Sequence, residues 1–197
     1  MGDQVYQHRP MRALQRLRVK ALSISQEETS FQTRGFSAPT RTIQEHLETV
    51  GKTFLIGYHA ALDDEPVEVL GARLREVDID WQGFAFEGAA MGLSLLDRLS
   101  LMGRGKRIPQ FLASAGQGHS YMIHVGVGWA MARIPWGRRR EVFRLDPLLR
   151  WLAVDGYGFH EGFFRFDRYA GGEGRRRFRA RIGNGHSIRD SVAACGL

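Results

Sequence analysis

Apolar residues recur at steps of three and four along residues 42–62, which is the spacing of an amphipathic helix. Thr42 and Glu45 have the spacing of a capping box, so we expect Thr42 to cap the start of this helix. The face that it turns toward a core consists of Ile43, Leu47, Val50, Phe54 and Tyr58.

A second amphipathic helix is expected directly afterwards. Asp64 or Glu65 can cap it, and Pro66 suits its first turn, where the backbone N–H has no intrahelical partner. Its apolar stripe consists of Val69, Leu70, Leu74 and Val77.

Residues 83–102 predict a helix that is apolar almost all round, which is typical of the centre of a bundle. Glu87 shares one face of this helix with apolar side chains. Gly88 and Gly92 each lower helix propensity by about 1 kcal/mol. We therefore expect close packing or a ligand to compensate at these two glycines.

The segment HSYMIHVGVGWAMARIP, residues 119–135, can be interpreted in two ways. Its β-branched and aromatic residues and its glycines favour a strand. The spacing of Tyr121, Val125, Trp129 and Ala132 favours a helix. We predict a buried helix that ends at Pro135.

Asp146 and Pro147 predict the start of a further apolar helix, with Gly156 as its candidate C-cap. The string that follows, GYGFHEGFFRF, has no pattern that assigns it. Together the patterns predict an all-α fold, a compact helical bundle around a buried central helix. They show no convincing internal repeat.

Composition divides the chain into three parts. Residues 1–38 are a basic, partly helical segment and a connector, and residues 39–167 form the helical core. Residues 168–197 are rich in arginine and glycine and poor in apolar residues, so we expect a poorly ordered tail. A chain of 197 residues with 43% hydrophobic residues is large enough to bury a core in one domain or two small ones.

Several classes of protein are excluded or disfavoured. The single Cys195 excludes an internal disulfide framework and cysteine-based zinc fingers. The first residues lack the apolar core of a secretory signal, and the longest apolar stretch carries Glu87, Asp97 and Arg98, so we expect a cytoplasmic protein without a membrane span. The net charge is +7, but +5 of it lies after residue 164, so we expect no nucleic-acid partner.

A buried carboxylate and two histidines are the first candidates for chemistry. Glu87 is either a structural carboxylate with a partner or a general acid or base whose pKa burial raises. His119 and His124 are five residues apart, so a regular helix cannot bring both to one ion. They are either packed histidines or, around Gly126 and Gly128, part of an irregular site.

The glycine-punctuated aromatic segment holds Asp155, His160 and Glu161. Such a segment can hold polar side chains against an apolar cavity, although packing and backbone hydrogen bonds would also explain them. No histidine or carboxylate spacing matches a known metal motif, so we expect no metal, and the cofactor is left open. The candidate catalytic residues are Glu87, His124, Asp155, His160 and Glu161.

Three strings, GFAFEGAAMGLSLLD, HSYMIHVGVGWAMAR and LDPLLRWLAVDGYGFHEGFF, resemble a bacterial family of unknown function that is associated with enediyne biosynthesis. The resemblance covers residues 11–167. Genes of that family often lie near the iterative polyketide synthase that makes the enediyne core. Its members are typically longer, so we expect a shortened member, either a truncated or frameshifted copy with an incomplete domain or a short natural variant.

The resemblance implies an accessory protein of enediyne or polyketide-type secondary metabolism, acting on or binding an apolar, polyene-like intermediate. The alternative is a non-catalytic scaffold or binding protein for the synthase or a neighbouring pathway component. The family transfers no catalytic residues. An incomplete bundle would expose apolar surface, so we also expect self-association.

Overall fold

A computed structural model of the chain describes residues 16–100, 105–134, 142 and 145–165. Every regular element in these residues is a helix, which confirms the predicted all-α fold. The chain divides into two compact units, Met1–Ile123 and His124–Leu197. The predicted tail, residues 168–197, lies outside the described residues, and the predicted domain boundaries stay predictions.

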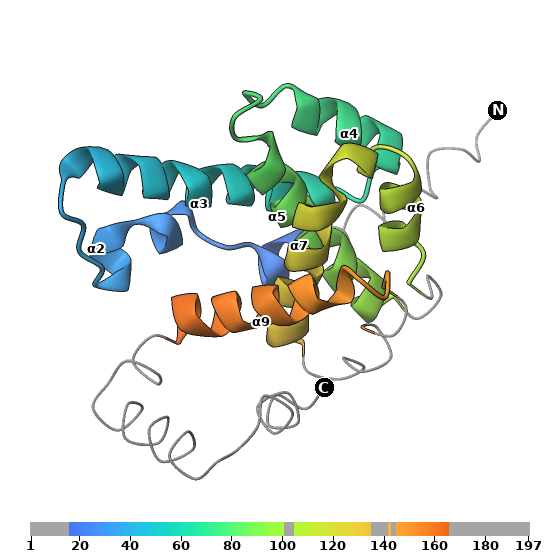
Figure 1. Cartoon of the computed structure of the whole chain (residues 1–197). Coiled ribbons are helices and arrows are strands. Elements are labelled where there is room, and N and C mark those ends of the chain that lie inside the picture. The colour runs from blue at the N-terminus through green and yellow to red at the C-terminus, as the bar shows by residue number, and fades with distance from the viewer. Residues whose placement is uncertain (1–15, 101–104, 135–141, 143–144, 166–197) are drawn as a thin grey trace, which may run out of the picture. The chain divides into compact units, whose positions relative to one another are not determined.

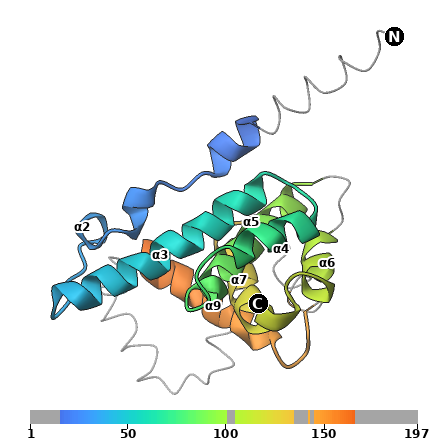
Figure 2. The same ribbon diagram turned by 90° about the horizontal axis from the view of Figure 1, so that it is seen from above.

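Residues 16–22 are helical, and the named helices follow in chain order (Figures 1 and 2). The first unit contains η1 (Gln26–Thr29), α2 (Phe31–Arg34), α3 (Arg41–Leu62), α4 (Val67–Arg75), α5 (Gln82–Leu99), α6 (Arg107–Ala113) and η2 (Gln117–His119). Helix α7 (Ser120–Arg133) begins in the first unit and continues into the second, which also contains α9 (Arg150–Phe164).

The long predicted helices are confirmed, but two of their start signals are wrong. Helix α3 begins at Arg41, and its cap is Thr40, whose hydroxyl accepts a hydrogen bond from the Ile43 N–H at 3.3 Å. Thr42 lies inside the helix. Helix α4 has no side-chain cap, because Asp64 instead binds Arg107.

Helices α3 and α5 approach so closely that backbone touches backbone. A Cβ atom on Gly57 would lie 1.8 Å from the carbonyl oxygen of Ala85, and one on Gly88 would lie 1.8 Å from that of Phe54. No side chain fits at such distances, so glycine is required at both positions. On α5, every residue from Ala85 to Leu96 is buried, which confirms the predicted buried central helix.

Only part of the apolar stripe of α3 is buried in the core. Phe54 and Tyr58 are buried, and the Tyr58 hydroxyl donates to the Leu22 carbonyl at 2.6 Å. Ile43 and Leu47 are exposed, because the N-terminal half of α3 does not face the α5 crossing. The spacing of the stripe alone does not show where the partner helix stops.

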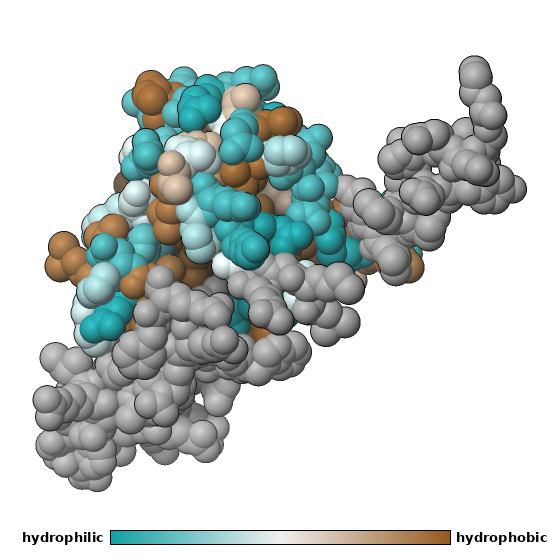
Figure 3. Space-filling model, turned by 90° about the vertical axis from the view of Figure 1, so that its right-hand side faces the viewer, coloured by the Kyte–Doolittle hydropathy of each residue, from teal (hydrophilic) through white to brown (hydrophobic). Residues whose placement is uncertain are grey.

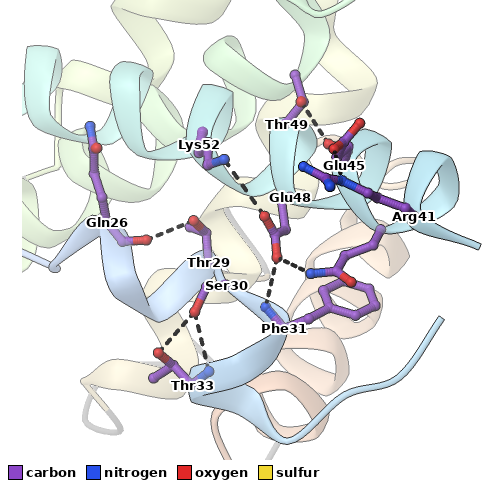
Figure 4. Close-up of polar contacts among 11 residues, drawn as sticks. Gln26, Thr29, Ser30, Phe31, Thr33, Arg41, Glu45, Glu48, Thr49 and Lys52 are labelled. Carbon is purple, nitrogen blue, oxygen red and sulfur yellow. Dashed lines mark hydrogen bonds and ion pairs between the residues drawn. The ribbon is translucent and has the colours of Figure 1, made fainter.

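A polar contact holds the start of α2 beside the N-terminal half of α3 (Figure 4). The Glu48 carboxylate accepts hydrogen bonds from the Phe31 N–H at 3.0 Å and from the Gln44 amide at 2.9 Å. Lys52 lies 3.7 Å from the other carboxylate oxygen. A single carboxylate on α3 therefore anchors the first turn of α2.

A cluster of ion pairs connects the end of α3, the end of α5 and the start of α6 in the first unit. Arg107, at the start of α6, donates from Nε and Nη2 to the two carboxylate oxygens of Asp64 at 2.8 and 3.1 Å, and from Nη1 to Asp97 at 3.0 Å. Arg18 lies 3.2 Å from Asp64. Bidentate arginine–carboxylate pairs are directional, so the cluster sets how the ends of α3, α5 and α6 meet.

In the second unit, α7 and α9 also cross so closely that backbone touches backbone. A Cβ on Gly128 would lie 2.1 Å from the carbonyl oxygen of Ala153, and one on Gly156 would lie 2.0 Å from that of Val125. The predicted helix is confirmed as α7 from Ser120 to Arg133, whereas Gly156 as a C-cap is wrong. Pro135 lies outside the described residues.

Helix α9 incorporates the segment that its pattern leaves unassigned. It continues through Gly156 to Phe164, because this glycine serves the crossing with α7 instead of ending the helix. Asp146 as the cap of this helix is wrong: its carboxylate accepts from the Leu148 and Leu149 N–H groups at 2.8 and 3.0 Å, but α9 begins at Arg150, and its N-cap, Leu149, has no side-chain cap hydrogen bond. A turn over residues 147–149 then leads into α9.

Figure 3 shows hydrophobic residues in several separate groups among hydrophilic ones on the face that it presents. The large apolar side chains that are exposed include Ile79, Leu148, Trp151 and Phe159. Among the described residues, none of the helices combines the length and the apolar composition that crossing a membrane requires. Whether the exposed groups cause self-association stays a prediction.

The four glycines at which the helices cross, Gly57, Gly88, Gly128 and Gly156, should tolerate no side chain. We expect Gly88→Ala and Gly156→Ala each to lower the free energy of unfolding by about 3 kcal/mol, because the added Cβ pushes a helix backbone away. Gly158→Ala is the matched control, since its Cβ meets nothing within 4 Å. It should raise the free energy of unfolding by about 0.5–1 kcal/mol through helix propensity. Urea unfolding measures all three, and equal effects at Gly156 and Gly158 would contradict the crossing.

Candidate functional site

Helix α9 turns one face toward α7 and thereby positions His160. Ala153, Gly156 and His160 recur at steps of three and four and are all buried. Gly156 packs directly against the backbone of Val125 on α7. His160 is one helical turn after Gly156 along α9, so it lies beside Trp129 on α7. The crossing thus determines which side chain of α7 His160 meets.

His160 is part of an aromatic cluster in the second unit. The centroid of its ring lies 4.8 Å from the ring centroid of Phe164 and 5.6 Å from that of Trp129. The rings of His160 and Trp129 meet edge to face. Trp129 is 8% exposed, whereas Phe159 is 65% exposed, so the cluster runs from the core to the surface. Its members are Trp129, Phe159, His160, Phe163 and Phe164.

Two polar groups are buried at this cluster. His160 is 7% exposed and Glu161 is 5% exposed. Nδ1 of His160 lies 3.7 Å from Oε1 of Glu161, which is longer than a hydrogen bond. The other oxygen of Glu161 lies 3.1 Å from Arg165. The Nδ1 atom of His160 has no hydrogen-bond partner among the described residues.

Burial lowers the pKa of His160 to about 4, since it disfavours the charged ring. The carboxylate of Glu161 opposes this shift, while the cations Arg165 and Arg133 add to it. The imidazole is therefore neutral near pH 7 and can accept a hydrogen bond. Nδ1 of His160 and Oε1 of Glu161 thus form a buried polar pair, 3.7 Å apart, beside aromatic rings.

The other candidate residues lie elsewhere. Asp155 is on a different, exposed side of α9, so it does not join His160 and Glu161. His124 on α7 is buried, and it lies close enough to Asp146 to contribute to the lowered pKa of that carboxyl, after the backbone hydrogen bonds from Leu149 and Leu148. Their proposed catalytic roles stay predictions.

Two candidates belong to the first unit. Glu87 is 7% exposed on α5, directly before the crossing residue Gly88. The ring of His119 stacks on Phe86 at 4.0 Å, and burial, aided by Arg75, lowers the pKa of His119. In the described part of the chain, no three histidine, cysteine or acidic side chains gather as metal ligands.

Sequence reasoning overlooks three residues of this site. Trp129 meets His160 only through the helix crossing, and Arg133 contributes charge from the same helix. Arg165 pairs with Glu161 one helical turn away. The four-residue spacings of His160 to Phe164 and of Glu161 to Arg165 would reveal these neighbours once the segment is interpreted as a helix.

Acid should destabilise the fold through His160. An unfolded histidine takes up a proton near pH 6.5, whereas folded His160 does so only at about pH 4, so the unfolded state binds more protons in between. This contribution to stability is fully present above pH 6.5 and is lost as the pH falls to 4. Its size is on the order of 3 kcal/mol, and urea unfolding across this pH range measures it.

Two variants separate titration of His160 from packing. His160→Phe should remove this part of the pH dependence. Phe163→Leu perturbs the same aromatic cluster without removing the histidine, and should keep it. An unchanged pH dependence in His160→Phe would show that another group is responsible.

Comparison with curated proteins and with solved structures finds no match. A family match covers residues 13–183, which includes both crossings and the aromatic cluster. The family is described as Protein of unknown function (DUF1702), and the chain belongs to it.

Proposed function

We propose that this chain is a cytoplasmic accessory protein of bacterial enediyne or polyketide-type biosynthesis that binds an apolar, polyene-like intermediate. The observation that carries the proposal is the buried pair His160 and Glu161 within the aromatic cluster of the second unit. The pathway context comes from the resemblance of the three sequence strings to the enediyne-associated family.

Aromatic rings and a few buried polar groups are the usual lining of small-molecule sites. The rings of Trp129 and Phe164 stand edge to face at 88°, so a flat, conjugated chain would stack on one ring and meet the edge of the other. Nδ1 of His160, which has no hydrogen-bond partner among the described residues, would fix the orientation of a polar end, because a buried polar atom without a partner is unfavourable. A polyene with a polar terminus matches both requirements.

The lowered pKa of His160 favours binding over acid–base catalysis. A general base works best when its pKa lies near the working pH. The pKa of His160 is about 4, so near pH 7 its ring holds a proton only weakly. Its stronger role is that of a neutral hydrogen-bond partner.

The alternative function, a scaffold for the synthase or a neighbouring component, is favoured by a different observation. Leu148, just before α9, and Trp151, in the first turn of α9, are exposed. Stoichiometry separates the two functions, since a small-molecule binder saturates at one ligand per chain without any partner protein.

Fluorescence titration with retinol, a conjugated polyene with one hydroxyl group, tests the proposal. We expect saturable binding at one retinol per chain. Trp129→Leu should weaken this binding about tenfold or more, which corresponds to about 1.4 kcal/mol, through loss of ring contact.

The matched control is Trp81→Leu, which removes a tryptophan ring from the first unit, where Trp81 contacts His46 and Phe84. It should leave retinol affinity unchanged. Absence of saturable binding, or equal effects of the two tryptophan variants, would contradict the proposed function. Circular dichroism of each variant checks that the helices are retained.

A further inference from the structure

The side of α9 opposite its buried residues carries large aromatic side chains. Trp151 is 56% exposed and Phe159 is 65% exposed, although both belong to one regular helix. Exposed aromatic residues on one helix face are typical of an interaction surface. The exposed positions recur at steps of three and four, and we call them the outer face of α9: Trp151, Asp155, Gly158, Phe159, Gly162 and Arg165.

Two glycines of the outer face have no packing role in the described part of the chain. A Cβ on Gly158 or on Gly162 would meet nothing within 4 Å. Glycine disfavours a helix, so it needs a compensating contact. On the inner side of the same helix, Gly156 has one, because it admits α7 to backbone contact. The outer glycines therefore leave room for a second helix to approach the backbone of α9.

The outer face is symmetric about the level of residue 160. Gly158 and Gly162 lie two residues before and after this level, and Asp155 and Arg165 lie five residues before and after it. In an antiparallel crossing of two α9 helices at this level, each Gly158 would meet the partner's Gly162. Each Asp155 would approach the partner's Arg165. A two-fold interface requires this kind of self-complementarity.

Arg165 can pair with its own helix and with a second copy together. Its Nη1 atom lies 3.1 Å from Oε2 of Glu161, one helical turn earlier. The Arg165 side chain is nevertheless 49% exposed, and a guanidinium group has five N–H donors. Further donors thus remain for a carboxylate of another chain, and Asp155 is exposed.

We propose that the outer face of α9 binds a second copy of this chain, the two α9 helices crossing antiparallel at Gly158 and Gly162. Phe159, one residue from the centre, supplies apolar contact. The occupant is a second copy because charges and glycines match their own counterparts at equal distances from the centre. The inference does not depend on polyene binding, since His160 lies on the opposite, buried side of α9.

Sedimentation equilibrium of the full chain measures the dissociation constant of the dimer. The wild-type chain should form a dimer that dissociates on dilution. Phe159→Ser should raise the dissociation constant about tenfold or more through lost apolar contact. The matched control is Ile79→Ser, which removes an exposed apolar side chain from the first unit and should change nothing. A monomer at every concentration, or equal effects of the two variants, would overturn the inference and leave polyene binding untouched.

A charge exchange tests the antiparallel pairing. Asp155→Arg places an arginine opposite the partner's Arg165 and should raise the dissociation constant about tenfold or more, because like charges repel. Combining Asp155→Arg with Arg165→Asp exchanges the two charges and should restore the dimer. Circular dichroism checks that the helices are retained. If the folded double variant dimerises no better than Asp155→Arg alone, the proposed pairing is wrong.

Gly158→Ala separates the interface from the fold of the single chain. At a dilution that keeps the chain monomeric, the substitution should raise the free energy of unfolding, because alanine favours a helix and its Cβ meets nothing within 4 Å. In the dimer the same methyl group would meet the partner's backbone, so the dissociation constant should rise about tenfold or more. An unchanged dissociation constant would show that the two α9 backbones do not touch, and would overturn the inference.

Discussion

Contact between a glycine on one helix and a backbone carbonyl on another is the constraint on which the rest of this structure depends. It occurs twice in each unit, at Gly57 and Gly88 and again at Gly128 and Gly156. Glycine in a helix is unfavourable by about 1 kcal/mol, so each crossing needs the dense packing and weak Cα–H···O contacts that close approach provides. The burial of α5 and the meeting of Trp129 with His160 both follow from where these glycines stand.

Most of the helices can be predicted from the sequence because their apolar residues are numerous and regularly spaced. The spacing along α3 and the apolar composition of α5 and α7 are sufficient for this. Helix α9 is harder, since three glycines follow Val154 and glycine near an apolar run normally indicates a helix end. Packing against α7 overrides that local preference at Gly156, which no local pattern can show.

The candidate site is predictable only in part. His160 and Glu161 are neighbours in sequence, and both belong to the buried group. Asp155 is five residues earlier, so once the segment is a helix it lies on a different side, where it is exposed. Trp129 comes from a different helix, and its place beside His160 depends on the crossing, which is a tertiary contact.

The short chain length between paired glycines also bears on how the protein folds. Each crossing closes a loop of about thirty residues, so its decisive contact forms between segments that are near each other in sequence. Loop closure of that size is a small entropic barrier, and contacts of low sequence separation accompany fast folding. Each helix pair can therefore assemble from its own two helices, without waiting for the other pair to form.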